Sequence, residues 1–158
     1  MTLDQFRKLS NFHEQETDIY KRLLTSNLKG VSNTLMRKMD NAITLAKEYF
    51  NYARGQFIVH DINSGNHSGK SLHYEGKAID GSFVDIPIRE QFMLMLKAGF
   101  TGVGCYTEKV WTHPGIHADI RSQPHVSIWL CNERKLGKQI YEYNFRKIMD
   151  WLLGERHE

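Results

Sequence analysis

The stretch SGNHSGKSLHYEGKAID, residues 64–80, carries two motifs that predict incompatible chemistries. The first, GNHSGKS, has the general look of a phosphate-binding loop, but that loop needs four residues between its glycines, and Gly65 and Gly69 enclose only three. The residues that follow, LHYEGKAIDG, are more typical of a strand than of the helix that such a loop opens. The spacing therefore argues against a nucleotide site.

His73 and Asp80 predict a different site in the same stretch, one that holds a metal ion. The H-x-x-G-x-A-x-D spacing lets the histidine leave a loop while the aspartate arrives on the strand that follows. Gly76 and Ala78 keep the backbone between them close and unobstructed. A catalytic metal centre commonly has three protein ligands and a fourth position open to water. We therefore expect a third ligand from elsewhere in the chain.

The segment PGIHADIR, residues 114–121, supplies the next candidates. Because side chains alternate along a strand, His117 and Asp119 share one face, and Ile116, Ala118 and Ile120 share the other. His117 can ligate a metal, and Asp119 can orient a ligand or accept a proton. A surface or core role is the commoner one for a single histidine, so the prediction depends on the combination.

Three motifs follow one another along the chain: Ser71-x-His73-x-x-Gly76-x-Ala78-x-Asp80, Gly102-Val-Gly-x-Tyr106 and His117-x-Asp119. Together they resemble the zinc D-Ala-D-Ala carboxypeptidase family, which includes cell-wall endopeptidases and phage endolysins. The same scaffold occurs in the hedgehog signalling domain. The resemblance covers residues 58–130, whereas the helices on either side match only in general character.

This resemblance implies that His73, Asp80 and His117 bind Zn²⁺. The implied activity is that of a zinc metallopeptidase, a carboxypeptidase or an endopeptidase, acting on peptidoglycan stem or cross-link peptides. In such sites zinc polarises the scissile carbonyl and lowers the pKa of its bound water toward about 7, so that hydroxide is available as the nucleophile.

The general base is harder to assign, because the sequence departs from the family pattern. Many members place Glu or Asp three residues before the third zinc ligand, where this chain has Pro114, which cannot exchange a proton. The candidates are His113, Asp119 and Glu108. We favour His113 because imidazole titrates near neutrality, with Asp119 as the second catalytic candidate.

A second departure lies in SGNHS, where relatives commonly have SGYRS and the arginine contacts the substrate. Here His67 takes that place, and it lacks the permanent charge and the bidentate fork of arginine. We expect His67 and Ser71 to bind substrate, with Lys70 as the candidate cation that compensates for the missing arginine. The two departures favour an alternative function, a non-catalytic zinc-binding module of a virion or of a wall-binding protein.

Hydrophobic periodicity predicts one α+β domain over residues 1–158. We expect a helical N-terminal part (1–55), a metal-site core with a small, mainly antiparallel sheet (56–132) and a closing helix (137–155). Within the first part we expect a long helix over residues 32–54, preceded by one or two shorter helices around Phe12, Ile19, Leu23 and Leu24. Within the second part we expect a helix over residues 88–98, which Gly99 ends in a left-handed turn. Tyr141, Phe145, Ile148 and Leu152 would lie on one face of that last helix. The two cysteines, Cys105 and Cys131, are expected to be buried free thiols.

Composition narrows the classes of partner. A net charge of +3 with scattered basic residues argues against a nucleic-acid patch, and no apolar run is long enough to cross a membrane. The start, MTLDQFRKLSNF, lacks the order of a secretory signal. We therefore expect a protein made in the cytoplasm that acts at the cell wall and, if a phage encodes it, reaches the wall by holin-dependent release or as part of a virion. The composition does not define the oligomeric state, and a monomer is assumed.

Overall fold

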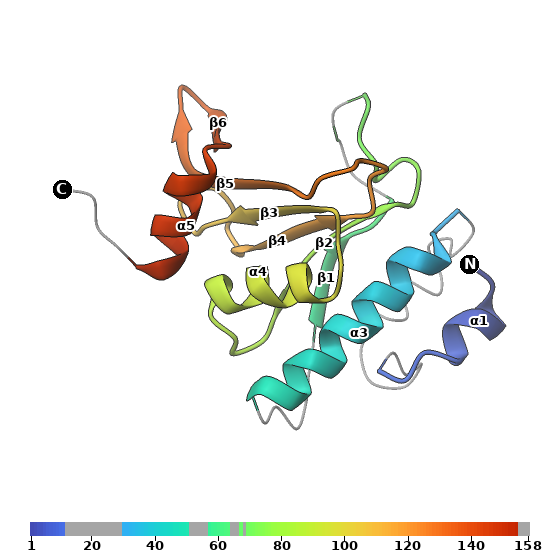
Figure 1. Cartoon of the computed structure of the whole chain (residues 1–158). Coiled ribbons are helices and arrows are strands. Elements are labelled where there is room, and N and C mark those ends of the chain that lie inside the picture. Colours follow the sequence, from blue (N-terminus) through green and yellow to red (C-terminus); the bar gives the residue numbers. More distant parts are fainter. Residues whose placement is uncertain (12–29, 51–56, 64–66, 68, 155–158) are drawn as a thin grey trace.

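Figure 1 shows the computed structural model, in which helices lie against a six-stranded sheet. The structure describes residues 1–11, 30–50, 57–63, 67 and 69–154. Within these residues the helices are α1 (Leu3–Arg7), α3 (Asn33–Phe50), α4 (Ile88–Lys97) and α5 (Phe145–Leu153). The strands are β1 (Phe57–Asp61), β2 (Ala78–Phe83), β3 (Gly102–Tyr106), β4 (Gly115–Asp119), β5 (Ser127–Lys135) and β6 (Lys138–Glu142). The predicted α+β class is confirmed.

The sheet is open and mixed, with the strand order β1-β2-β4-β3-β5-β6. Every neighbouring pair is antiparallel except β3 and β5, which run parallel. The prediction of a mainly antiparallel sheet is therefore confirmed, with one parallel pair that the sequence did not reveal. Strand β4 lies between β2 and β3, so it is hydrogen-bonded on both sides.

One face of the sheet is covered by α3 and α4 and forms the main core (Figure 1). On β4, Ile116 and Ala118 are fully buried in this core, as the alternation predicted, while His117 points to the other face. The core also contains the apolar face of α3: Leu35, Met36, Met39, Ala42, Ile43 and Ala46. The opposite face of the sheet is thereby left for polar side chains.

The helix expected over residues 88–98 is present as α4. Gly99 follows it with φ +85, and its N–H donates to the carbonyl of Leu96, which matches the predicted left-handed ending. The long helix predicted for residues 32–54 is observed as α3 (33–50). Its last predicted turn and the helices expected around Phe12, Ile19, Leu23 and Leu24 lie outside the described residues.

The closing helix predicted from residue 137 is wrong in its first part. Residues 138–142 form β6, because Leu136 and Gly137 both have positive φ and make a two-residue turn that returns the chain along β5. Tyr141 therefore belongs to a strand. The helix begins only after Asn144, whose side chain accepts from the Lys147 N–H, and it buries Ile148.

Cys105 and Cys131 are both buried free thiols, as expected. Burial raises the pKa of Cys105 well above its ordinary value, so this thiol is not ionised near neutral pH. The two residues therefore contribute to packing.

Candidate metal centre

Three side chains predicted as ligands converge on the open face of the sheet. Asp80 on β2 and His117 on β4 are direct partners across the antiparallel pair, so residues 37 positions apart lie side by side. His73 arrives from the loop that precedes β2. Its Nε2 lies 3.2 Å from Nδ1 of His117 and 3.3 Å from Oδ1 of Asp80, and those two atoms are 2.8 Å apart.

These separations suit a shared metal ion. Ligand atoms about 2.0–2.1 Å from a tetrahedral ion stand roughly 3.3 Å from one another. The three observed distances, 2.8, 3.2 and 3.3 Å, lie at or slightly below that value. All three side chains are largely removed from solvent, with exposed fractions of 1% for His73, 12% for Asp80 and 14% for His117. This group can hold a metal ion.

The second nitrogen of each histidine fixes its tautomer and its ring orientation. Nδ1 of His73 lies 2.8 Å from the carbonyl oxygen of Ile62, and Nε2 of His117 lies 3.0 Å from a carboxylate oxygen of Asp119. Both oxygens can only accept, so these nitrogens carry protons. The remaining lone pairs, Nε2 of His73 and Nδ1 of His117, face the common point. Three acceptors then meet there without a donor, and a cation would satisfy all of them.

Without a cation, a proton takes that place. Burial disfavours a charge on His117, but its hydrogen bonds to Asp119 and Asp80 outweigh burial and raise the pKa of His117 to about 9. Burial also opposes ionisation of Asp80, yet its hydrogen bonds with His117 and His73 hold the pKa of Asp80 well below its usual range. The metal-free cluster is thus a carboxylate beside an imidazolium.

Asp119 is fully buried and supports His117 from behind. Arg121 binds it with two side-chain contacts, Nε to Oδ1 at 2.8 Å and Nη2 to Oδ2 at 2.5 Å. Despite burial, the hydrogen bonds from Arg121 and His117 hold the pKa of Asp119 below its usual range. Of the two roles predicted for Asp119, orientation of a ligand is the one for which the structure provides contacts.

Two glycines of the GVG motif make room for these side chains. A Cβ on Gly102 would lie 2.3 Å from Asp119 and 2.5 Å from Arg121, and one on Gly104 would lie 2.2 Å from the ring of Trp129. Any larger residue at either position would displace the support of His117 or the neighbouring wall of the pocket. The two glycines are therefore needed to leave space for Asp119, Arg121 and Trp129, and not to form a turn.

His67 lies beside the candidate ligands without joining them. Its ring stacks on His73, with centroids 4.0 Å apart and planes 3° apart, and its Nε2 is 2.6 Å from Asp61. Asp61, His67 and His73 have side-chain atoms close enough for a second metal site. However, Nδ1 of His73 is bound to Ile62 and Nε2 faces the first site, so His73 has no nitrogen left for a second ion.

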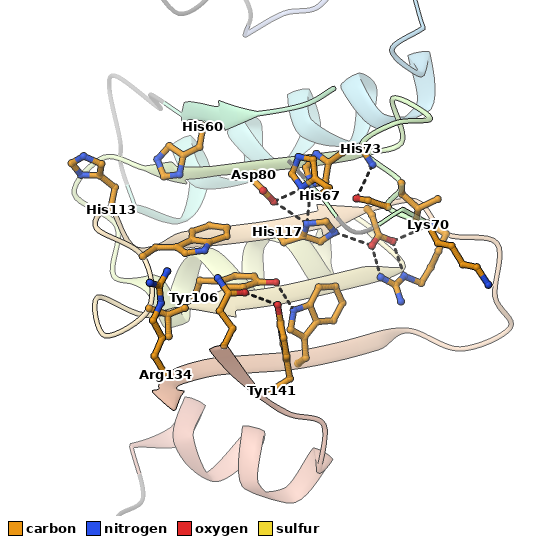
Figure 2. Close-up of a pocket in the computed structure, with 18 of the residues that line it drawn as sticks. His60, His67, Lys70, His73, Asp80, Tyr106, His113, His117, Arg134 and Tyr141 are labelled. Atoms are coloured by element: carbon orange, nitrogen blue, oxygen red, sulfur yellow. Dashed lines mark hydrogen bonds and ion pairs between the residues drawn. The ribbon is translucent and has the colours of Figure 1, made fainter. Parts of the chain in front are cut away.

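A pocket of about 990 Å³ opens over the cluster and contains most of the other predicted site residues (Figure 2). Ser71 lines it and accepts from the His73 N–H at 3.4 Å. His113 also lines it but is exposed, and its ring packs 6.4 Å from that of His60 instead of contacting the ligands. Lys70 lies at the opposite end from His113.

An aromatic wall adjoins the cluster. Tyr106 and Trp111 stack with centroids 4.0 Å apart, and Trp129 donates from Nε1 to the Tyr106 hydroxyl at 3.1 Å. For Tyr106 and Trp111 the sequence favours core packing, with an apolar wall for the alanine methyls of the substrate as the alternative. Trp129 and Arg121 were not singled out, although the alternation in IHADIR places Arg121 on the face of His117.

Comparison with known families, with curated proteins and with solved structures finds no match. Among the described residues, no helix combines the length and the apolar character that crossing a bilayer requires. The geometry of the cluster and the residues around it are therefore the features that point to a function.

Proposed function

We propose that this protein is a zinc metallopeptidase that hydrolyses a peptide bond in peptidoglycan stem or cross-link peptides. The observation that carries the proposal is the convergence of His73 Nε2, Asp80 Oδ1 and His117 Nδ1 within 2.8–3.3 Å beneath an open pocket. Two imidazoles and one carboxylate, with space left for water or substrate, are a donor set that suits catalytic zinc. The motifs that carry the family resemblance contain the same three residues.

His73, Asp80 and His117 would hold the ion, and Asp119 with Ile62 would keep the two imidazoles in their ligating tautomers. When bound, zinc supplies a Lewis acid for the scissile carbonyl and an acidified water near neutral pH. His113, at the pocket edge, is the candidate that would take a proton from that water. His67 and Ser71, on the side of His73, would contact the peptide.

A non-catalytic zinc-binding module is the second candidate. The observation that favours it is the environment of the proposed base: His113 is exposed, it has Pro114 beside it, and within the described residues its ring contacts His60 and not the ligands. Such a module would bind zinc and gain stability from it without any turnover. The two candidates therefore differ only in the chemistry that follows metal binding.

Zinc content and product analysis on the same samples distinguish the candidates. Wild-type protein, His73→Ala and the control His125→Ala, which changes an exposed histidine outside the pocket, are analysed for bound zinc and then incubated with purified peptidoglycan. We expect one zinc per chain and newly formed peptide ends with wild type and His125→Ala, and neither with His73→Ala. Zinc without new ends would favour the module, and wild type without zinc would refute both.

A further inference from the structure

The pocket is elongated along the strands, with the cluster in its middle. Across β3 and β4, Gly102 pairs with Asp119, Gly104 with His117 and Tyr106 with Gly115. Asp119 and Arg121 therefore mark one end of the pocket, and Tyr106 with the following Trp111 marks the other. Figure 2 shows Lys70 toward the first end and His113 with Arg134 toward the second.

Arg134 is the unusual group at that second end. The pocket is lined by three side chains with permanent positive charge, of which Arg121 is already bound to Asp119. Outside the backbone ladder of β5 and β6, the side chain of Arg134 has no hydrogen bond or ion pair with any other residue that the structure describes. The acidic residues among the described lining are Asp80 and Asp119, both within the cluster. A guanidinium is thus left available at the end of a pocket that offers it no carboxylate.

Neighbouring side chains complete a polar recess around Arg134. Gln139, its direct partner on β6, accepts from the hydroxyl of Tyr141 at 2.5 Å through its side-chain oxygen. This leaves the amide N–H groups of Gln139 free of any protein acceptor in the described chain. Tyr141 packs edge-on against Tyr106, so the recess is continuous with the aromatic wall. Its donors, a guanidinium and an amide, suit a carboxylate.

The distance from the cluster sets where that carboxylate must lie on a ligand. His117 and Trp129 both pair with Gly104, and Arg134 comes five residues after Trp129 (134 against 129). Because β5 has a one-residue irregularity between Leu130 and Glu133, these five residues advance by only about four strand spacings. At about 3.3 Å per spacing, the backbones are roughly 13 Å apart along β5. Part of this is covered by the side chain of Arg134 itself. The remainder holds two or three peptide residues, each of which spans about 3.3–3.6 Å.

We propose that Arg134, with Gln139, forms a carboxylate subsite that binds an acidic group two or three residues from the peptide bond at the cluster. The inference rests on the proposed peptidase function and names a specificity determinant for it. Arg134 recognises the ligand and takes no part in bond breaking. An acidic stem peptide has two groups that could fill the subsite, the α-carboxylate of its γ-linked D-glutamate and its C-terminal carboxylate.

The test uses four synthetic probes based on the pentapeptide L-Ala-γ-D-Glu-L-Lys-D-Ala-D-Ala. One probe is unchanged, one has D-isoglutamine in place of D-glutamate, one has a C-terminal amide, and one has both changes. Their Kd values are measured by calorimetry on zinc-loaded wild type, Arg134→Gln and the control Lys135→Gln. Lys135 is the next residue on β5, exposed and outside the pocket, so the control makes a similar charge change.

For wild type and Lys135→Gln, we expect one of the two amidations to raise Kd about 10-fold or more, the usual size of a charge-assisted hydrogen bond. For Arg134→Gln, the acid and its amide should bind equally and weakly. Arg134→Lys should retain part of the discrimination, because it keeps the charge and loses the fork. Which amidation matters identifies the carboxylate that fills the subsite.

The subsite is refuted if wild type binds all four probes equally, if it binds none of them, or if Arg134→Gln retains the discrimination. Cleavage products are followed in the same samples, so the two proposals fail separately. Carboxylate-dependent binding without cleavage would uphold the subsite and reject the peptidase. Cleavage without carboxylate dependence would uphold the peptidase and reject the subsite.

Discussion

Two pairs of histidines lie in the same pocket and differ in almost every physical respect. His73 and His117 are largely buried, and each has its second nitrogen bonded to a fixed oxygen. His60 and His113 are exposed, with ring centroids 6.4 Å apart and no carboxylate between them. Loss of hydration where the His60 ring packs against the protein, together with the nearby His113, lowers the pKa of His60, although Asp80 opposes this.

The difference shows that the density of histidines does not define a metal site. A ligand needs a lone pair aimed at a common point, and the partner of the other nitrogen determines that aim. Ile62 and Asp119 provide this for His73 and His117. Within the described residues, the hydrogen-bond contact of His60 is a 3.4 Å approach of its Nε2 to the Ser82 hydroxyl, and its ring otherwise packs against those of Trp111 and His113. In the part of the chain that the structure describes, no carboxylate or carbonyl therefore fixes the direction of either nitrogen. The comparison can be tested by changing one pair and then the other.

The largest expected effect is loss of the metal from His117→Ala. Removing one of three ligands should lower zinc affinity by more than about 100-fold. This exceeds the loss of about 10- to 100-fold that is typical when a residue hydrogen-bonded to a metal ligand is replaced. His60→Ala should leave zinc bound, because His60 supplies no ligand. Competition with a chromogenic chelator measures both affinities. An equal loss in the two variants would show that the ligand assignment is wrong.

A smaller effect concerns pH and the metal-free protein. Its His117 has a pKa of about 9 in the folded state against 6.5 in the unfolded chain, so the stabilisation is complete below about pH 6.5 and disappears as pH rises through 9. The loss is on the order of 3 kcal/mol. Thermal unfolding of zinc-free wild type between pH 6 and 10 measures it, and His117→Ala should lack this slope.

The same proton links metal binding to pH. At pH 7 the metal-free His117 is protonated, so zinc has to displace about one proton from it. Calorimetric titration of zinc in buffers of different ionisation enthalpy counts the protons released. Above pH 9 the release should disappear. A count of zero at pH 7 would mean that His117 is neutral before the metal arrives.

Asp119→Asn tests the support of His117. The amide keeps the shape of the carboxylate but loses the charge that binds Arg121 and orders the imidazole. We expect zinc affinity to fall about 10- to 100-fold, less than in His117→Ala. Asp85→Asn, at an exposed left-handed turn position that asparagine tolerates, is the matched control. An unchanged affinity in Asp119→Asn would remove Asp119 from the site.

The smallest effect is expected from Tyr74→Phe. The Tyr74 hydroxyl accepts from the His67 N–H at 3.0 Å and donates to the His67 carbonyl at 3.1 Å, which holds the His67 ring against His73. Because these bonds are exposed and uncharged, their loss should cost about 1 kcal/mol or less. Urea denaturation measures the change. A loss comparable to that of Asp119→Asn would give His67 a larger role in the site than proposed.

The three candidate ligands were predicted as a set through the family resemblance, and local patterns account for their positions. Alternation along β4 determines the face on which His117 lies. His73 and Asp80 are only seven residues apart, on the loop that leads into β2 and on β2 itself, so they stay close whatever the rest of the chain does. The sequence did not predict Arg134 at the pocket end, because that position depends on a hairpin. The turn at Leu136 and Gly137 has no asparagine or aspartate to mark it, and Tyr141, Phe145 and Ile148 fit a helical period.

Other features could not be predicted because they arise from pairing between distant strands. Nothing local indicates that β3 runs parallel to β5, yet this pairing places Trp129 over Gly104. The contact of Asp61 with His67 likewise depends on how β1 ends beside the loop before β2. In each case the sequence contained the residue but no signal for its partner.

The position of β4 inside the sheet affects which strands lose their backbone hydrogen bonds first in local unfolding. Strand β4 is bonded on both sides, whereas β6 is an edge strand that pairs only with β5. Amide hydrogens of β4 should exchange with deuterium among the slowest in the protein, and those of β6 among the fastest. The hairpin that carries Arg134 should therefore open more readily than the strand that carries His117, so one end of the pocket can change shape while this candidate ligand stays in place.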